Sequence, residues 1–257
     1  MNRTVRIQEL DPDMIEPSTE NFMNPESTGS KIVVIGKPGT GKTTLISGFL
    51  YEKKHIFPAA QVYSGTEDSN HFYSKTVQPV FVFNSFETEH LTRAIKRQKI
   101  AKKHIRNPWL VCLLDDVTDD TAKLRTKEFQ GVFKNGRHWK LLFILSLQYC
   151  MDIKPVIRTN IDYSFILRES NLRNRKNLWI NYASCVSDFS DFCDLMDQLT
   201  DDYTALVVNN RVQSNKIEDC IFYYKAPIPP EGWVFGCNDY KLFNDDRYNN
   251  EYVDPAV

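Results

Sequence analysis

The sequence predicts an α/β fold with a doubly wound, mostly parallel sheet. Short apolar runs alternate along the chain with segments that have the periodicity of amphipathic helices. Several runs are apolar almost throughout, as in 110–114 and 141–145, which is typical of parallel strands covered by helices on both faces. The last two runs flank the polar segment 209–219 and favour an antiparallel C-terminal hairpin at the edge of the sheet.

The expected strands follow one another at a spacing that leaves room for helical crossovers. They are 31–35, 61–64, 80–84, 109–115, 141–147, 163–167, 205–208 and 220–224. Between the fourth and the fifth, a segment of about 119–134 has room for one helix and a right-handed crossover. These two strands are therefore expected to be neighbours in the sheet.

Polar segments flank this core at both ends. Residues 1–29 are rich in Asp, Asn and Pro and are expected to form a loosely packed arm. Residues 238–257 are rich in Asn, Asp and Tyr and are expected to form an irregular tail. Because no repeat or low-complexity linker lies between them, residues 30–237 are expected to form one domain.

The composition excludes some classes of protein. With 32 basic and 33 acidic residues, the chain is not a strongly basic protein that grips nucleic acid over its whole surface. The six cysteines are far apart and form no C-x-x-C pair, which indicates reduced thiols in a reducing compartment. No run of about 18 apolar residues is present, so a soluble, intracellular protein without a membrane span is expected.

A phosphate-binding motif lies at the first core strand. Residues 36–43 fit G-x-x-x-x-G-K-[ST], follow a strand and open a helical pattern, which is the context that a P-loop requires. Its backbone amides and the helix N-terminus would face the phosphates, with Lys42 reaching them and the Thr43 hydroxyl binding Mg²⁺. The residues expected to bind nucleotide are Gly36, Lys37, Pro38, Gly39, Thr40, Gly41, Lys42, Thr43 and Thr44.

Two carboxylates end the strand 109–115. Since ligands bind at the carboxyl ends of parallel strands, Asp115 is expected to hold Mg²⁺ and Asp116 to orient and polarise the water that attacks the γ-phosphate. The alternative is a strand end that leads into a solvated acidic turn, because Asp119 and Asp120 follow closely.

Gln148 ends the neighbouring strand, 141–147, and is expected beside the two carboxylates. An amide at this place can bond both the γ-phosphate and the attacking water, and so sense whether the phosphate is attached. The alternative is an ordinary polar residue at a strand end.

Arginines are needed because charge builds on the γ-phosphate in the transition state. Arg137 precedes the strand 141–147, away from the chain's own phosphate edge, and is therefore better placed to reach a neighbouring subunit. Arg168, Arg173 and Arg175 follow the strand 163–167 and could act as sensors or as contacts across an interface. For each arginine the alternative is a surface ion pair.

The ordered set of 36–43, 115–116, 136–138 and Gln148 resembles the FtsK/HerA superfamily of DNA-pumping ATPases. Within it, the chain is most similar to the poxvirus-type virion packaging ATPases of large nucleocytoplasmic DNA viruses. The resemblance implies a P-loop NTPase domain of the RecA/FtsK-like type.

Two later segments, 165–171 and 215–219, are also similar to that family, and the resemblance extends over roughly 31–226. It implies ATP and Mg²⁺ as ligands, with Asp115 on the metal and Asp116 activating water. Related motors often carry Glu where Asp116 stands, so this carboxylate is one methylene shorter.

The resemblance further implies Gln148 as phosphate sensor and Arg137 as a finger supplied in trans. The implied assembly is a homo-oligomeric ring, a pentamer or hexamer, with double-stranded DNA threaded through it and packed into a capsid. Capsid or portal-vertex proteins and a nuclease are the implied partners, in the virion or the host-cell cytoplasm.

Basic residues give independent but weaker indications of DNA binding. Seven Lys or Arg residues lie within 93–106 on an amphipathic segment, which could follow a phosphate backbone or could be a solvated helix face. Lys123, Arg125 and Lys127 are fewer but closer to the predicted catalytic edge, and are the expected DNA contacts.

Two other functions remain open from the sequence. A nucleotide or small-molecule kinase is one, because the arginines after residue 167 resemble those of a phosphate-covering lid, although a kinase that must exclude water does not need Asp116. A nucleotide-dependent switch is the other, because 215–218 is close to the N-K-x-D pattern for guanine but ends in Glu.

Overall fold

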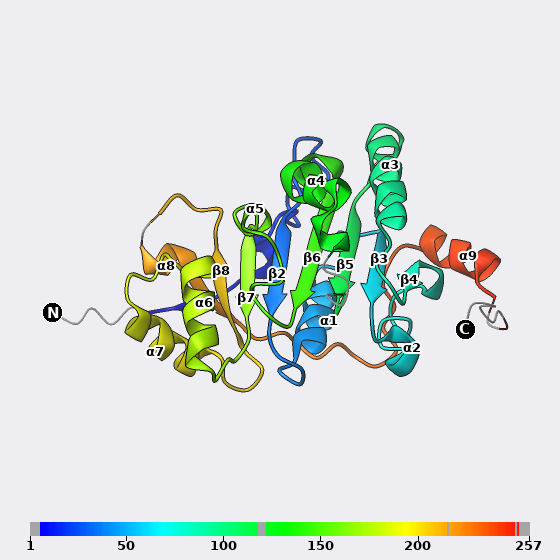
Figure 1. The fold of residues 1–257 in the computed structure, drawn as a ribbon. Coiled ribbons are helices and arrows are strands. Elements are labelled where there is room, and N and C mark those ends of the chain that lie inside the picture. The colour runs from blue at the N-terminus through cyan, green and yellow to red at the C-terminus, as the bar shows by residue number, and fades with distance from the viewer. Residues whose placement is uncertain (1–5, 118–121, 215, 250, 252–257) are drawn as a thin grey trace.

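The computed structural model describes residues 6–117, 122–214, 216–249 and 251. Their strands form a single sheet in the order β1-β9-β8-β7-β2-β6-β5-β3-β4, which runs across Figure 1. The strands are β1 Gln8–Glu9, β2 Lys31–Ile35, β3 Ala59–Ser64, β4 Val82–Phe83, β5 Leu110–Asp115, β6 Leu141–Leu147, β7 Tyr163–Ile166, β8 Ala205–Asn209 and β9 Ile221–Tyr224.

Most neighbouring strands are parallel. The pairs from β7 through β2, β6, β5 and β3 to β4 are all parallel, whereas β8 is antiparallel to both β7 and β9. This confirms the predicted α/β class with its antiparallel C-terminal hairpin. The hairpin is not outermost, however, because the short β1 pairs in parallel with β9. The expected strand 80–84 is also shorter, because Pro79 begins a 3₁₀ turn, Pro79–Phe81.

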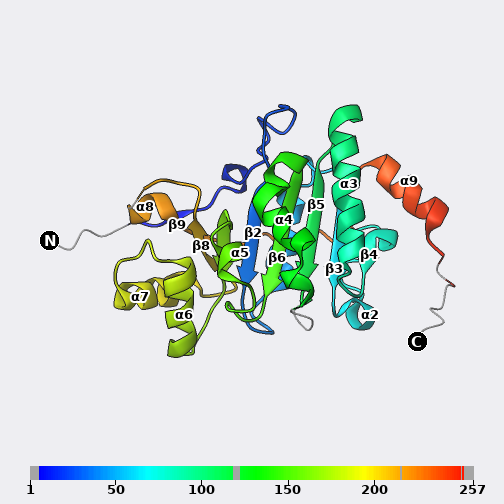
Figure 2. The same cartoon turned by 45° about the horizontal axis from the view of Figure 1, so that its top comes forward.

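Helices cover both faces of the sheet (Figures 1 and 2). Helix α1 lies on one face, while α3 and α4 lie on the other, as expected for a doubly wound sheet. The α-helices are α1 Lys42–Glu52, α2 Glu67–Asn70, α3 Thr88–His104, α4 Lys127–Asn135, α5 Pro155–Arg158, α6 Leu172–Tyr182, α7 Phe189–Leu199, α8 Ile217–Cys220 and α9 Asn238–Arg247. In the described parts of the chain, no helix combines the length and apolar character needed to span a bilayer.

The expected helix 119–134 corresponds to a 3₁₀ turn, Lys123–Arg125, followed by α4. Asp119 and Asp120 lie outside the described residues. The crossover returns the chain from β5 to its neighbour β6, as the sequence predicts.

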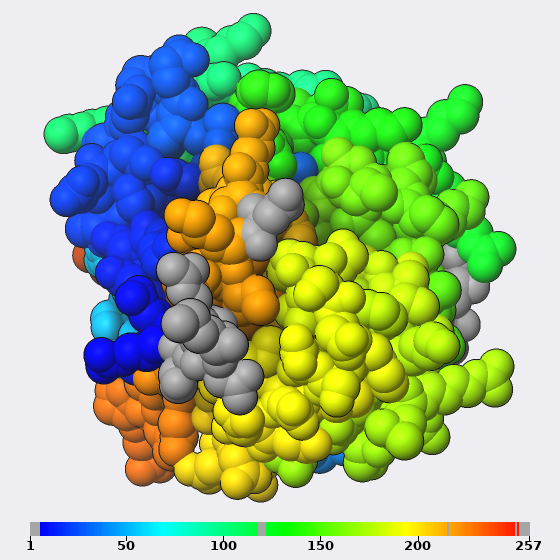
Figure 3. Space-filling model, turned by 90° about the vertical axis from the view of Figure 1, so that its left-hand side faces the viewer, coloured from blue at the N-terminus to red at the C-terminus, as the bar shows by residue number. Residues whose placement is uncertain are grey.

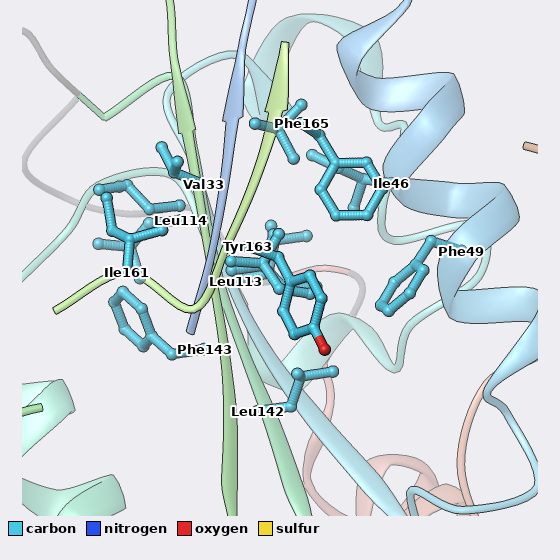
Figure 4. Close-up of a cluster of buried hydrophobic side chains, with 14 of the residues drawn as sticks. Val33, Ile46, Phe49, Leu113, Leu114, Leu142, Phe143, Ile161, Tyr163 and Phe165 are labelled. Carbon is cyan, nitrogen blue, oxygen red and sulfur yellow. The ribbon is translucent and has the colours of Figure 1, made fainter. Parts of the chain in front are cut away.

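The central strands are buried on both faces. In Figure 4 Leu113 and Leu114, consecutive residues of β5, point to opposite sides of the sheet, and both are fully buried. On the α1 side, Phe49 packs edge to face against Phe165, with Ile46 beside them. Burial on both faces explains why these strands are apolar at successive positions.

The N-terminal residues differ from the loosely packed arm that was expected. Leu10 and Ile15 are buried, and Lys53, directly after α1, donates hydrogen bonds to the carbonyls of Pro12 and Ile15 at 2.9 and 2.7 Å. Figure 3 shows this segment, in blue, against the orange surface that includes β9 and α8. Buried apolar side chains and hydrogen bonds to the backbone thus hold this polar segment on the core.

The C-terminal segment differs from the expected irregular tail, because 238–247 form α9. After β9 the chain crosses the sheet to the far side, where α9 lies beyond β3 and β4 (Figure 1). On the way, the Phe235 amide donates to the Thr76 carbonyl at 2.9 Å. The Tyr240 hydroxyl then donates to the Ala60 carbonyl of β3 at 2.7 Å. These bonds fix the last helix on the core.

Candidate active site

The carboxyl ends of β2, β6 and β5 bring the predicted site together. Ile35 of β2 is paired with Leu147 of β6, and β5 ends beside β6. The segments that follow these strands therefore meet at the lower edge of the sheet in Figure 1. They carry the P-loop, the Asp115–Asp116 pair and Gln148. The prediction that β5 and β6 are neighbouring strands is confirmed, and their carboxyl ends lie together.

The P-loop curls because two of its glycines have left-handed backbones. Gly39 has φ 78° and Gly41 has φ 94°, a region that other residues rarely adopt. Thr40 closes the turn by donating its hydroxyl to the Lys37 carbonyl at 2.7 Å. Helix α1 begins at Lys42, so its free amides and partial positive charge face the loop.

Lys42 lies inside the loop, with only 8% of the residue exposed. Its ammonium donates to the Gly36 carbonyl at 2.7 Å and, more weakly, to the Lys37 carbonyl at 3.4 Å. Burial lowers the pKa of Lys42, while the charges of Asp115 and Asp116 oppose this shift. The cation is thus held at the centre of the loop and close to the two carboxylates.

Asp115 is buried, and one of its oxygens accepts two hydroxyl hydrogen bonds. The Tyr73 hydroxyl donates to Oδ2 at 2.8 Å, and the Thr43 hydroxyl donates to the same atom at 3.3 Å. The other oxygen, Oδ1, is buried and has no hydrogen-bond partner among the described residues. A carboxylate and a hydroxyl are hard oxygen ligands of the kind that Mg²⁺ takes, and the unpartnered Oδ1 fits a cation at this place.

Tyr73 is positioned by a second buried carboxylate. Glu67, in α2 after β3, accepts the backbone amides of Tyr73 at 3.0 Å and Ser74 at 2.9 Å. Burial, and then the negative charge of Asp115, raise the pKa of Tyr73 well above its ordinary value. Its phenol therefore remains a neutral hydrogen-bond donor at neutral pH.

Asp116 and Gln148 are in direct contact. The Gln148 amide donates a hydrogen bond to Oδ1 of Asp116, and both side chains are half-buried. Asp116 has a left-handed backbone with φ 54°, so the chain turns sharply after β5. Functional sites often hold a non-glycine residue in this region, because a sharp turn aims the side chain.

These residues surround an open hollow of about 420 Å³. Its volume is within the range of small-molecule sites, and its walls are polar and apolar in nearly equal parts. The lining residues are Pro38, Gly39, Gly41, Lys42, Thr43, Thr44, Thr66, Asp115, Asp116, Gln148 and Tyr203.

Glu169, after β7, ties the P-loop to the adjacent strand. Its carboxylate accepts from the Lys37 ammonium at 2.6 Å and from the Asn174 amide at 3.0 Å. Burial opposes ionisation, but the hydrogen bonds from Lys37, Asn171 and Asn174 outweigh it and lower the pKa of Glu169. Lys37 thus points away from the hollow and holds the loop in place.

The three arginines after β7 lie in different surroundings. Arg175 is buried and forms a two-pronged ion pair with Asp197 at 2.9 and 2.6 Å. Arg168 is exposed and pairs with Asp197 at 3.5 Å and Asp201 at 3.6 Å. Arg173 is exposed near the start of α6. None of the three lines the hollow at the P-loop.

Arg137 lies at the opposite edge of the sheet, in the 3₁₀ turn before β6. It forms an ion pair with Asp162, whose carboxylate is 2% exposed, while the Arg137 side chain is 42% exposed. Asp162 also accepts the backbone amide of Lys31 at 2.8 Å. Arg137 therefore lies away from the P-loop hollow of its own chain and has an ion-pair partner within that chain.

The basic residues predicted to contact DNA lie along the turn and helix that follow the catalytic edge. Lys123 forms an ion pair with Glu87 at 2.7 Å, whereas Arg125 and Lys127 are exposed. The longer basic segment forms most of α3, whose buried face includes Leu91 and places the charged residues in solvent.

The sequence did not identify Tyr73, Glu67 or Tyr203 as site residues. Glu67 follows β3 at the same edge as Asp115, so the strand-end argument that found Asp115 could have found it. Tyr73 and Tyr203 lie in irregular segments, where no periodicity indicates which way a side chain points.

Sequence comparisons match the chain to viral proteins. The model of the family described as Poxvirus A32 protein matches residues 24–225. The uncharacterized protein 075L of Invertebrate iridescent virus 6 is 48% identical over 249 residues, which cover 96% of each chain. The uncharacterized protein 088R of Invertebrate iridescent virus 3 is 45% identical over 241 residues, covering 93% of this chain and 92% of that protein.

Solved structures share the fold. The genome packaging NTPase B204 from Sulfolobus turreted icosahedral virus 2, in complex with AMPPCP, superposes with a TM-score of 0.56 at 16% identity, covering 79% of this chain and 100% of B204. The pCW3 conjugation coupling protein TcpA with ATPgS has a TM-score of 0.52 at 12% identity, covering 85% of this chain and 64% of TcpA. The expected P-loop ATPase fold is confirmed by these likenesses.

Proposed function

Since the chain belongs to the Poxvirus A32 protein family, we propose that it is an ATP-hydrolysing motor that moves double-stranded DNA, most specifically to package a viral genome into its capsid. The proposed ATP hydrolysis rests on one observation, the contact of Gln148 with Asp116 on the wall of the P-loop hollow. The DNA part is supported by the family and by the fold that the chain shares with a genome packaging NTPase.

The P-loop hollow would hold the triphosphate of ATP with Mg²⁺. The backbone amides of the loop would donate to the phosphates, except those of Pro38, which has no N–H, and Gly36, which donates to the Leu147 carbonyl. The Lys42 ammonium would exchange its bond with the Gly36 carbonyl for a phosphate oxygen. Thr43 and Asp115 would hold Mg²⁺, which supplies positive charge against the phosphate oxygens. Tyr73 would fix the orientation of the Asp115 carboxylate.

Asp116 would position the attacking water. Its carboxylate would accept a hydrogen bond from the water and take up the proton as the oxygen attacks the γ-phosphorus, while the bond from that phosphorus to the β–γ bridging oxygen breaks and ADP leaves. The Gln148 amide donates to Oδ1 of Asp116, and we expect it to respond when the γ-phosphate leaves. This hydrogen bond would also set the orientation of the Asp116 carboxylate.

Negative charge that develops in the transition state calls for a further cation, and no arginine of the described residues lines the hollow. A neighbouring subunit in a pentameric or hexameric ring would supply it. Arg137 is the proposed finger, because it lies at the other edge of the sheet and its side chain is partly exposed. Arg168, Arg173 and Arg175 would then act as sensors or interface contacts.

DNA would run through the ring, with Lys123, Arg125 and Lys127 as its proposed contacts. These residues follow Asp116 closely in sequence, in the turn Lys123–Arg125 and at the start of α4. Capsid or portal-vertex proteins and a nuclease would complete the apparatus at the assembly site, in the virion or the host-cell cytoplasm.

Phosphate release measured with and without long duplex DNA tests this function. We expect turnover that increases with DNA, and at least about a hundredfold loss in Asp116→Asn with ATP binding retained. Asp239→Asn, on α9 and far from the site, is the matched control and should keep full turnover. Transfer of phosphate to an acceptor in place of phosphate release would indicate a kinase, and no increase with DNA in an assembled ring would exclude a DNA motor.

A further inference from the structure

The segment between α7 and β8, residues 200–204, lies against the P-loop. A Cβ atom added to Gly41 would be 2.8 Å from Cδ1 of Tyr203, so the tyrosine ring rests directly on the loop. Asp202 and Tyr203 both have left-handed backbones, with φ 47° and 59°. Two successive non-glycine residues in this region are unusual and point to a local constraint on the loop.

Two ion pairs and a hydrogen bond constrain residues 201–204 of this segment. Asp202 pairs with Lys225 after β9, and Asp201 pairs with Arg168 at 3.6 Å. The Thr204 amide donates to the Asp201 carbonyl at 3.0 Å, which closes the turn. The strained backbone is therefore held by its surroundings.

Tyr203 is nevertheless 65% exposed and does not belong to the buried core. Core packing therefore does not explain why a large aromatic side chain stands here. The Tyr203 side chain instead separates two adjoining hollows. One is the P-loop hollow, and the other, of about 290 Å³, is lined by Thr40, Leu167, Arg168, Thr200, Asp201, Asp202, Tyr203 and Thr204.

The sheet order determines which end of a nucleotide would reach the second hollow. Asp116 and Gln148 follow β5 and β6, on one side of β2, so the γ-phosphate must point to that side. Leu167 and Tyr203 belong to the segments around β7 and β8, on the other side of β2. A triphosphate that lies along the P-loop thus directs its nucleoside toward Tyr203.

We propose that the second hollow binds the base of the nucleotide, with the Tyr203 ring stacked on it. The buried Leu167 side chain provides an apolar floor, and the Arg168 guanidinium provides a second planar group at the wall. This inference rests on the proposed function only in that the ligand is a nucleoside triphosphate. It assigns a role in binding to Tyr203 and none in hydrolysis.

Calorimetric titration of the full chain separates base binding from phosphate binding. The probes are the non-hydrolysable analogue adenylyl-imidodiphosphate with Mg²⁺, and inorganic tripolyphosphate with Mg²⁺, which has no base. Tyr203→Gly removes the ring and suits the left-handed backbone, so the loop keeps its shape. We expect this substitution to raise the Kd of the analogue by about tenfold, which is the size of one lost base–aromatic stack. The Kd of tripolyphosphate should not change.

Two further variants serve as controls. Tyr203→Phe keeps the ring and should bind the analogue like the wild type. Tyr248→Ala removes another partly exposed tyrosine, after α9, and should change neither titration. Equal weakening of both ligands by Tyr203→Gly would mean that the ring only supports the P-loop, and a change below about twofold for the analogue would mean that the base lies elsewhere. Either result, or no binding of the analogue to the wild type, overturns the proposal.

This test is independent of DNA. A wild-type protein that binds the analogue but shows no turnover with DNA would contradict the motor function and leave the base site intact. Conversely, ATP turnover that increases with DNA, together with analogue binding that Tyr203→Gly does not change, would support the motor function and contradict the base site.

Discussion

The hydroxyl of Tyr73 donates a 2.8 Å hydrogen bond to Oδ2 of Asp115, the same oxygen that accepts from Thr43. Two donors on one oxygen leave the other, Oδ1, buried and without a hydrogen-bond partner in the described parts of the chain. Under the proposed function, Tyr73 would therefore orient Asp115 for a cation, although the two residues are far apart in sequence.

Tyr73→Phe should weaken the binding of Mg²⁺ rather than that of the phosphates. The ring keeps its place, but Asp115 loses one of two donors and can rotate. We expect about a tenfold higher Mg²⁺ concentration at half-maximal ATP turnover, in line with the usual cost of removing a bond to a metal ligand.

Tyr240→Phe is the matched control for this variant. Its hydroxyl bonds the Ala60 carbonyl, so it also loses one buried hydrogen bond, at a cost of about 1 kcal/mol of stability. It should lower the melting temperature without changing the Mg²⁺ dependence. If both variants shift the Mg²⁺ titration equally, Tyr73 acts only through stability.

Gln148→Met tests the contact of Gln148 with Asp116. Methionine has a similar length but no donor, so the Asp116 carboxylate loses the amide that orients it. We expect kcat to fall roughly 10²- to 10³-fold with little change in ATP affinity, since the loss concerns the reacting water. Stopped-flow phosphate release and equilibrium binding of ATP measure the two quantities. A weaker ATP affinity with unchanged kcat would instead mean that Gln148 contributes to the binding of ATP and not to the chemical step.

Arg137→Ala should destabilise the fold, because it removes an ion-pair partner of the buried Asp162. The expected loss is about 1–3 kcal/mol, reduced from the cost of a fully buried pair because Arg137 is partly exposed. Chemical denaturation measures it, and Asp162→Asn should show a loss of similar size.

A finger acting in trans adds a separate expectation for Arg137. Arg137→Ala subunits should bind ATP but hydrolyse it poorly, whereas Asp162→Asn subunits should hydrolyse it normally once folded. Mixing Arg137→Ala with Asp116→Ala subunits should restore part of the turnover. If Asp162→Asn is as inactive as Arg137→Ala and mixing restores nothing, the arginine serves only the ion pair.

The buried Lys53 should make the free energy of unfolding depend on pH. Burial lowers its pKa to about 8, although Asp13 opposes the shift. Between this value and the ordinary pKa near 10.5, the unfolded chain binds more protons than the folded one, so the free energy of unfolding rises with pH. Lys31, whose pKa burial also lowers to about 8, contributes in the same direction.

Lys53→Met isolates the first contribution. From about pH 7.5 to about pH 10, the stability of the wild type should increase relative to the variant by on the order of 1–2 kcal/mol. Urea denaturation at both pH values measures this difference. A difference in stability that does not change with pH would mean that burial does not lower the pKa of Lys53.

The sequence was sufficient for the parts of the molecule that repeat a simple pattern. Burial on both faces made β5 and β6 recognisable, and the strand-end argument placed Asp115 and Gln148 at one edge. It was not sufficient where tertiary contacts decide. A few apolar residues such as Ile15 fix a polar N-terminal segment, and no local pattern brings Tyr73 to Asp115.

The crossing of the C-terminal segment over the sheet has a mechanical consequence. The bond from Phe235 to Thr76 connects this segment to the loop that carries Tyr73, so tension on the end of the chain would be transmitted toward Asp115. A load applied through the N-terminus would instead act on β1 and β9, at the other end of the sheet. Single-molecule tethers attached to the two ends should therefore affect turnover differently.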